Sequence, residues 1–195
     1  MRGIRTDNLS RSFGKKLVFS SAKLETGSHG FVILRGRNGS GKTTLLRVLS
    51  TLTEPSTGDA WIAGHSVRQD PRQARAKIGV VFSESLGFYH YLTGLENLNF
   101  FGALLGLSRK ETRAKIDGFA ELFPIREALT TKFLVQSAGM RQALRLCRAL
   151  LHDPRILLLD EPTRSLDTLV AGQIRSLLKA LAETRVVLCA THYEA

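Results

Sequence analysis

The chain has 195 residues, of which 43% are hydrophobic and only five are proline. This composition is typical of a globular protein with one sizeable core, and it excludes a disordered or fibrous chain. The 28 lysines and arginines outnumber the 17 acidic residues and give a net charge of +11. That charge is compatible with nucleic acid, an anionic membrane surface or a phosphate-rich ligand. The basic residues are spread along the chain, which also fits a generally solvated surface.

Targeting signals and cysteines narrow the class of protein further. Every apolar run is interrupted well before about 18 residues, so the chain has no predicted membrane span. Its first residues lack the apolar stretch of a secretory signal, which predicts a cytosolic location. Cys147 and Cys189 each lie in an apolar segment and form no metal-ligand pattern. We predict that both are reduced core residues.

The first informative segment predicts a strand, a glycine turn and a helix. Residues 31–34 are an apolar run that stops at Gly36, and residues 42–51 carry leucines at helical spacing. Residues 78–82 are compatible with a further strand. Residues 94–151 differ, because 96–107, 108–123 and 137–151 all have helical patterns with little strand signal among them.

The helical segment also carries terminus signals. Ser108 followed by Glu111 has the spacing of a capping box, and Pro154 closes the last of the three helices. We therefore interpret residues 94–151 as a helical insertion in a β-then-α pattern.

Two later apolar runs end in polar residues. Residues 156–159 are followed by Asp160 and Glu161, and residues 186–190 are followed by Thr191 and His192. Unalternated runs of this length, that of residues 31–34 included, favour strands buried on both faces, as in a parallel sheet covered by helices. Such sheets bind ligands at the carboxyl ends of their strands. Residues 167–183 have one apolar helix face and fit the crossover between the two runs.

The strongest chemical signal is a match to G-x-x-x-x-G-K-[ST] in the glycine turn. Glycines let the backbone wrap around phosphates, and the positive end of the following helix favours an anion. We predict a nucleotide phosphate site, with Lys42 on the outer phosphates and the Thr43 hydroxyl as a Mg²⁺ ligand. The alternative is a glycine turn without a nucleotide. The predicted binding residues of this loop are Gly36, Arg37, Asn38, Gly39, Ser40, Gly41, Lys42, Thr43 and Thr44.

Asp160 and Glu161 are adjacent carboxylates at the end of a predicted buried strand. Such a pair is costly unless a cation or a proton transfer uses it. We expect Asp160 to hold Mg²⁺ and Glu161 to act as the general base that polarises the attacking water. An acidic pair that merely starts a helix is the alternative.

In their order along essentially the whole chain, these motifs resemble the ATPase subunit of ABC transporters. The resemblance implies an α/β fold of the P-loop NTPase (RecA-like) type, with a mostly parallel sheet flanked by helices and a small N-terminal β subdomain. It implies one ATPase domain over residues 1–195. The nucleotide-binding core would comprise 1–93 and 152–195, and the helical subdomain 94–151.

Residues 137–142, S-A-G-M-R-Q, occupy the place of the family's signature motif. Ser137 suits a helix N-cap, and Gly139 leaves room for a phosphate near the helix start. The resemblance implies that this motif touches the γ-phosphate held by a partner subunit, in a head-to-tail homodimer or heterodimer. The S-x-G-M-x-Q form looks like that of exporter-type subunits for drugs, polysaccharides or heme. A capped amphipathic helix without this role is the alternative.

Three further residues take their roles from the resemblance. Asp167, in S-L-D, is similar to the family's D-loop. His192 is similar to the switch histidine, which donates a hydrogen bond to the γ-phosphate and orients the water of Glu161. Phe13 occupies the place of the aromatic that stacks on adenine. A structural histidine and an ordinary strand aromatic are the alternatives.

The chain also departs from the family pattern. Ser83 stands at the usual glutamine position, so either coupling to the membrane partner is altered or Glu84 substitutes. Arg35 and Arg37 are unusual beside a phosphate loop, where they add positive potential or face solvent. Gln136 stands where a stricter motif has leucine. The chain ends three residues after His192, which fits a naturally short subunit or a trimmed one.

The resemblance favours a Mg²⁺- and ATP-dependent motor subunit on the cytoplasmic face of the cell membrane, beneath separate membrane-spanning subunits. The alternative is a soluble regulatory or nucleic-acid-associated ATPase, for which the net charge is the main argument. Relatives of that kind carry two ATPase units or long coiled coils, so no nucleic acid is expected. A subunit that hydrolyses ATP poorly is a third reading, opposed by the presence of Glu161 and His192. The transported substance is not encoded in the chain.

Overall fold

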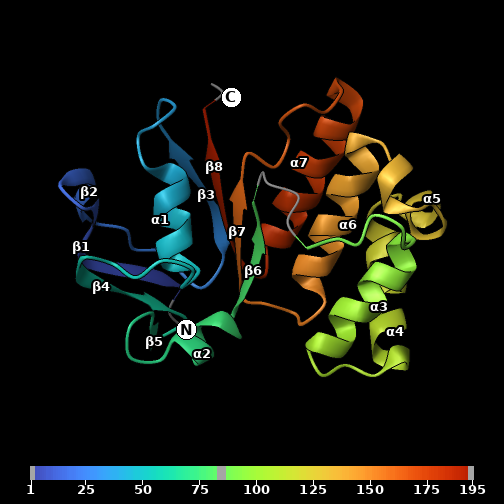
Figure 1. The fold of residues 1–195 in the computed structure, drawn as a ribbon, viewed down its shortest axis with the longest axis horizontal. Helices are drawn as coiled ribbons and strands as arrows, with labels where there is room; N and C mark the ends of the chain where they lie inside the picture. The colour runs from blue at the N-terminus through green and yellow to red at the C-terminus, as the bar shows by residue number, and fades with distance from the viewer. Residues whose placement is uncertain (1–2, 83–86, 193–195) are drawn as a thin grey trace. The chain divides into compact units, whose positions relative to one another are not determined.

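The computed structural model describes residues 3–82 and 87–192, which form two compact units. We call Met1–Val80, Pro154–Glu161 and Leu178–Ala195 the sheet unit, and Val81–Asp153 and Pro162–Leu177 the helical unit. The elements, in chain order (Figure 1), are β1 (Ile4–Phe13), β2 (Lys16–Ala22), β3 (Gly30–Arg35), α1 (Lys42–Leu49), β4 (Thr57–Ile62), β5 (His65–Ser66), α2 (Pro71–Arg75), β6 (Ile78–Val81), α3 (Gly94–Leu104), α4 (Arg109–Leu122), α5 (Arg126–Thr130), the 3₁₀ helix Phe133–Val135, α6 (Ala138–Leu150), β7 (Ile156–Asp160), α7 (Thr168–Ala182) and β8 (Val186–Thr191).

The central sheet of the sheet unit has the strand order β3-β8-β7-β6. Strand β8 pairs in parallel with both β3 and β7. In this register Arg35 lies opposite Thr191, and Asp160 lies opposite Ala190. The segments that leave β3, β7 and β8 therefore emerge at one edge of the sheet, as the sequence predicts.

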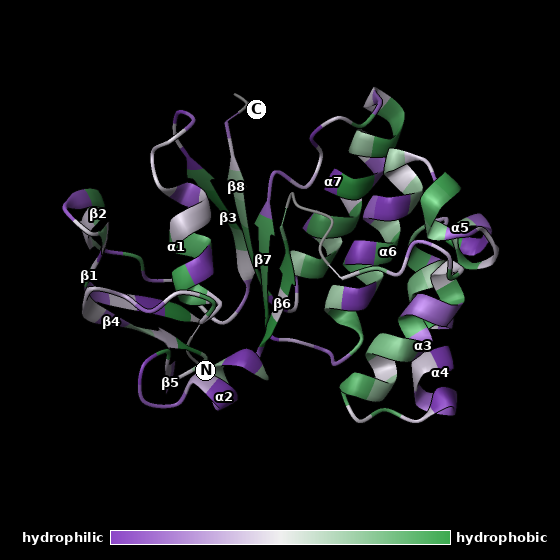
Figure 2. Ribbon diagram, viewed as in Figure 1, coloured by the Kyte–Doolittle hydropathy of each residue, from purple (hydrophilic) through white to green (hydrophobic). Residues whose placement is uncertain are grey.

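The strands of this sheet are not equally buried. All five residues of β7 are buried, and so are Val186 to Ala190 of β8; β7 is hydrophobic along most of its length in Figure 2. The prediction of burial on both faces is confirmed for these two strands. It is wrong for β3, where Phe31 is 38% and Ile33 is 43% exposed. Strand β3 stands last in the strand order, so its alternate side chains have fewer neighbours to pack against.

A second, antiparallel sheet with the order β2-β1-β4-β5 is the predicted small β subdomain. Helix α1 packs against β4 of this sheet and β7 of the central sheet (Figure 1). Its apolar face buries Leu45, Leu46, Val48 and Leu49. Because both sheets hold α1, the loop that precedes it is fixed relative to both.

The helical unit contains α3 to α6 and the N-terminal part of α7. Helices α3, α4 and α6 correspond to the three predicted helices, whereas α5 and the 3₁₀ helix were not predicted. The capping box at Ser108 and Glu111 is confirmed: the Ser108 hydroxyl accepts from the Glu111 N–H at 3.2 Å, and the Glu111 carboxylate accepts from the Ser108 N–H at 2.8 Å. Thr93 and Glu96 form a second box, with the same spacing, at the start of α3.

Both cysteines are core residues, as predicted. Cys147 and Cys189 are buried and form no disulfide. Burial raises the pKa of both thiols to about 12, which keeps them protonated and unreactive. Within residues 3–82 and 87–192, none of the helices combines the length and the apolar character needed to cross a bilayer.

Candidate functional site

The loop between β3 and α1 requires glycine at several positions. Gly39 and Gly41 have φ angles of 80° and 92°, in the left-handed region that favours glycine. A Cβ at Gly36 would lie 2.6 Å from the Ser40 Oγ. The loop therefore folds tightly on itself, with its backbone amides brought into a small space.

Helix α1 begins at this loop without a side-chain cap. Its N-cap is Gly41, and among the described residues no side chain accepts from its first backbone N–H groups. The positive end of the helix thus lacks the polar partner that a helix N-terminus normally has. Such an end suits an anion, and phosphate is the anion that proteins most often place there.

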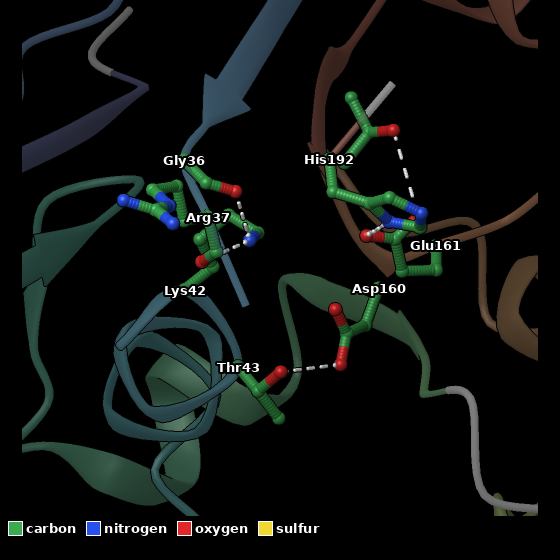
Figure 3. Close-up of polar contacts among 8 residues, drawn as sticks. Gly36, Arg37, Lys42, Thr43, Asp160, Glu161 and His192 are labelled. Carbon is green, nitrogen blue, oxygen red and sulfur yellow. Dashed lines mark hydrogen bonds and ion pairs between the residues drawn. The ribbon is translucent and has the colours of Figure 1, made fainter. Parts of the chain in front are cut away.

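Lys42 is the first residue of α1, and its side chain turns back into the loop. Its Nζ donates to the carbonyl of Gly36 at 2.5 Å and to that of Arg37 at 3.1 Å (Figure 3). The ammonium group is therefore held at the centre of the loop, beside the uncapped amides of α1. Arg35 and Arg37 are exposed.

Thr43 and Asp160 bring a hydroxyl and a carboxylate together across the sheet unit. The Thr43 Oγ1 donates to the Asp160 Oδ2 at 2.8 Å (Figure 3). Asp160 is only 4% exposed, and this burial raises the pKa of its carboxyl group, opposed in part by the Thr43 hydrogen bond. A second carboxylate, that of Glu161, raises this pKa further, whereas the charge of Lys42 lowers it.

These two oxygen donors fit a Mg²⁺ ion that also takes oxygens from phosphate and water. Mg²⁺ prefers hard oxygen ligands and is often held by one or two protein groups together with substrate phosphates. The described part of the chain holds no group of three His, Cys, Asp or Glu residues that could bind a metal by itself.

Glu161 and His192 face each other at the same sheet edge. The His192 Nδ1 lies 2.6 Å from the Glu161 Oε1 (Figure 3). The Glu161 side chain is 11% exposed and the His192 side chain is 29% exposed. Glu161 has a φ angle of 50°, an uncommon conformation for a residue with a side chain, and its N–H donates to the Ala190 carbonyl at 2.9 Å. Strained backbone of this kind is concentrated at functional sites.

Phe13 ends β1, on the hairpin that β1 forms with β2. It is 52% exposed, and it pairs with Lys16 across the hairpin. Further along β2, Val18 lies close to the phosphate loop, since a Cβ at Gly41 would be 3.0 Å from its Cγ1. Sequence reasoning missed Val18, because no local pattern relates it to a loop so far along the chain.

In the helical unit, the predicted site residues meet around Val170. Ser137 caps α6, because its hydroxyl accepts from the Met140 N–H at 3.2 Å, as predicted. Asp167 accepts from the Val170 N–H at 2.9 Å, at the start of α7. A Cβ at Gly139 would lie 3.1 Å from the Val170 Cγ1. Val170 thus joins the starts of α6 and α7, a role with no sequence signal of its own.

The structure describes one of the three residues Ser83, Glu84 and Gln136, which lie at or beside departures from the family pattern. Ser83 and Glu84 lie outside the described residues. Gln136 is 4% exposed, and its Nε2 donates to the carbonyls of Ala128 and Thr131, both at 2.8 Å. Where a stricter signature motif has leucine, this chain therefore fixes the approach to α6 with two hydrogen bonds.

Comparisons with known proteins show the family to which the chain belongs. The family model described as "ABC transporter" matches residues 19–164. The chain is 39% identical to the ABC transporter ATP-binding protein NatA of Bacillus subtilis over 158 aligned residues. The alignment covers 80% of the chain and 64% of NatA. It is 34% identical to the daunorubicin resistance ATP-binding protein DrrA2 of Streptomyces coeruleorubidus, over 97% of the chain and 59% of DrrA2.

A solved structure supports the same assignment. The dimeric structure of MJ0796, a bacterial ABC transporter cassette, superposes with a TM-score of 0.84 at 27% identity, covering 97% of the chain and 88% of the cassette. The chain spans less than two thirds of the length of the curated relatives NatA and DrrA2. The family model matches more than half of the chain. The chain therefore belongs to the ABC transporter family, among its ATP-binding proteins.

Proposed function

We propose that the chain binds and hydrolyses ATP with Mg²⁺, as the subunit that powers substrate movement by separate membrane-spanning subunits. One observation carries this proposal. A glycine loop with Lys42 at its centre, the Thr43–Asp160 pair and the Glu161–His192 pair all belong to the sheet unit, and they follow or adjoin parallel strands that end at the same edge. Phosphate binding, metal binding and proton transfer are the three tasks of phosphoryl-transfer enzymes.

In this proposal the loop binds the nucleotide. The backbone N–H groups of residues 36–44 surround the phosphates, and Lys42 turns from the carbonyls of Gly36 and Arg37 to the outer phosphates. Thr43 and Asp160 hold the Mg²⁺, which when bound neutralises charge on the phosphates. Phe13 stacks on the adenine.

Glu161 then acts as the general base. Its carboxylate accepts a proton from the attacking water as the water oxygen bonds to the γ-phosphorus, while the bond from that phosphorus to the β–γ bridging oxygen breaks and ADP leaves. His192 holds the carboxylate through Nδ1, so any contact with the γ-phosphate falls to its other ring nitrogen, Nε2.

A complete site needs a second ATPase subunit. We assign Ser137, Gly139 and Asp167 to contacts with the nucleotide that the partner subunit holds, in a homodimer or heterodimer. A solved relative is described as a dimeric post-hydrolysis state bound to ADP and Pi, at 26% identity to this chain, which supports the arrangement. Within the chain, residues 1–93 and 152–195 would form the nucleotide-binding core of one ATPase domain, and 94–151 its helical subdomain.

The direction of transport is outward in this proposal, and the subunit is peripheral on the cytoplasmic face of the cell membrane. Its S-A-G-M-R-Q motif has the exporter-type form. Relatives named for daunorubicin resistance and bacitracin transport, DrrA2 and BcrA of Enterococcus faecalis, support export of a small molecule.

The variant Glu161→Gln tests the proposal. We expect it to bind ATP and to form an ATP-dependent dimer in size-exclusion chromatography, while turnover falls by at least about 100-fold because the base is lost. Lys42→Ala is the matched control, which should bind ATP weakly and remain monomeric. Turnover of Glu161→Gln at the parent rate, or parent affinity in Lys42→Ala, would refute the proposed roles.

A further inference from the structure

Another residue of β1, Arg11, contacts the ring of Phe13. The Cζ of Arg11 lies 4.3 Å from the centroid of the Phe13 ring, the geometry of a cation–π pair. Arg11 and Phe13 are two positions apart on the same strand, so their side chains lie on the same face of the sheet. One face of the ring is therefore covered by the guanidinium group, although Phe13 as a whole remains 52% exposed.

Arg11 is itself held in place. Its Nη1 donates to the carbonyl of Glu54 at 2.9 Å, in the segment between α1 and β4. Its Nε is buried and has no hydrogen-bond partner in the described part of the chain. A guanidinium group that is partly removed from water interacts more strongly with an aromatic face than one that is fully hydrated. The ring of Phe13 thus rests on an anchored cation.

The hairpin that carries this pair adjoins the phosphate loop. Phe13 lies opposite Lys16 and Arg11 lies opposite Phe19 in the pairing of β1 with β2. Val18, between these two positions of β2, would be 3.0 Å from a Cβ at Gly41. The hairpin is therefore a direct neighbour of a nucleotide whose phosphates occupy the start of α1, within reach of its base.

We propose that Arg11 is a positioning residue for the base of the bound nucleotide. It holds the Phe13 ring in one orientation on its guanidinium group, so that the opposite face of the ring receives the adenine. A half-exposed phenylalanine at a hairpin turn would otherwise lose rotamer freedom when the base binds, and fixing the ring in advance removes that cost from binding. This inference rests on the proposed function, because it assumes that the loop binds a nucleotide.

The chain offers a matched control. Arg5 also lies 4.3 Å above an aromatic ring, that of Trp61, its cross-strand partner on β4. Arg5 and Arg11 thus make equivalent contacts on the same strand. Arg5 is eight residues from Phe13, about 25 Å along an extended strand. Loss of the Arg5–Trp61 pair should affect the stability of the fold without affecting the binding of the nucleotide base.

The experiment compares two probes, ATP and inorganic tripolyphosphate, by isothermal titration with Mg²⁺. Tripolyphosphate has the phosphates but no base, so it reports on the loop alone. We expect Arg11→Ala to weaken ATP binding by about 3- to 10-fold and to leave tripolyphosphate binding unchanged. Arg11→Lys should recover part of the loss, because it restores the cation. Arg5→Ala should bind both probes like the parent.

A double variant makes the test specific to the ring. If Arg11 acts through Phe13, the variant carrying Arg11→Ala and Phe13→Ala binds ATP no more weakly than Phe13→Ala alone. Parent affinity for ATP in Arg11→Ala overturns the inference, and so does an equal loss for both probes or an additive loss in the double variant. If the unmodified protein binds neither probe, the proposed function itself fails, which is a distinguishable result.

Discussion

Helices α1 and α6 both begin at glycine-containing motifs that the sequence links to phosphate, but they begin in different ways. The start of α1 has Gly41 at the N-cap, with a φ of 92° and no side-chain cap. The start of α6 has Ser137 in an extended conformation, and its hydroxyl accepts from the Met140 N–H. A side chain therefore accepts from one N–H at the start of α6, whereas the start of α1 has no side-chain cap and suits an anionic ligand.

The same contrast extends to the residues around each helix. In the sheet unit, burial raises the pKa of Asp160, a cost to its charged form that the Thr43 hydrogen bond offsets only in part. In the helical unit, Ser137 and Asp167 both cap helices, so their local contacts already account for them. The difference fits the proposed function: the sheet unit would bind the nucleotide by itself, whereas Ser137 and Asp167 are accounted for by their local contacts and would gain a second role only against a partner subunit.

The largest expected effect comes from Asp160→Asn. Without the carboxylate charge, Thr43 and the amide hold Mg²⁺ poorly, and we expect turnover to fall by about 1,000-fold. Thermal unfolding without Mg²⁺ provides the control. Burial raises the pKa of Asp160, so the folded protein retains this proton more strongly than the unfolded chain does.

The sign of the pH dependence follows from that raised pKa. The contribution of Asp160 to stability falls as pH rises from the ordinary carboxyl range through the raised folded pKa, and it stays low above it. Near neutral pH, Asp160→Asn should therefore unfold at the same or a higher temperature than the parent. A clearly lower unfolding temperature would mean that the carboxylate is structural, and that the two units do not differ as described.

A size exchange in the helical unit tests the other side of the comparison. A Cβ at Gly139 would lie 3.1 Å from the Val170 Cγ1, so Gly139→Ala should displace the start of α6. In a Glu161→Gln background we expect about 10-fold weaker ATP-dependent dimerisation, measured by sedimentation. Adding Val170→Ala should restore most of the loss, because it removes the atom that the new methyl meets.

Gly172→Ala, also on α7, is the matched control. A Cβ there would meet only the Arg175 Nη2, at 4.0 Å, so dimerisation should stay at the parent level. If Val170→Ala gave no recovery, the glycine would be needed for a reason other than its packing against α7.

Much of the fold follows from local patterns in the sequence. Uninterrupted apolar runs predict β7 and β8, and helical spacing predicts α1, α3, α4, α6 and α7. The exposure of Phe31 and Ile33 could not be predicted, because an apolar run does not reveal where its strand lies in the sheet. The short helix α5 was missed since five residues are too few to show a period.

The candidate site follows the same division. Lys42, Thr43, Asp160, Glu161 and His192 are predictable because each lies at a fixed offset from a strand end, and the register of β8 brings those ends together. The contacts of Arg11, Val18 and Val170 were not predicted, because they depend on packing between segments that no spacing relates. The left-handed backbone of Glu161 was likewise invisible in the sequence.

That backbone gives the smallest predicted effect, and it can be isolated by comparing two substitutions at one position. Glu161→Ala and Glu161→Gly both remove the carboxylate, but only glycine adopts a φ of 50° without strain. We expect the glycine variant to be more stable by about 0.5–1 kcal/mol, because relief of the left-handed conformation exceeds the entropy cost of glycine; this corresponds to about 1–4 °C in Tm. Ala63→Gly, in the turn between β4 and β5 with the same φ of 50°, is the reference for relief of strain away from the site. Suppose that Ala63→Gly gained stability while Glu161→Ala and Glu161→Gly were equally stable. The hydrogen bond from the residue 161 N–H to the Ala190 carbonyl would then hold the left-handed backbone without measurable strain. The sheet unit would hold its base at no cost to the fold.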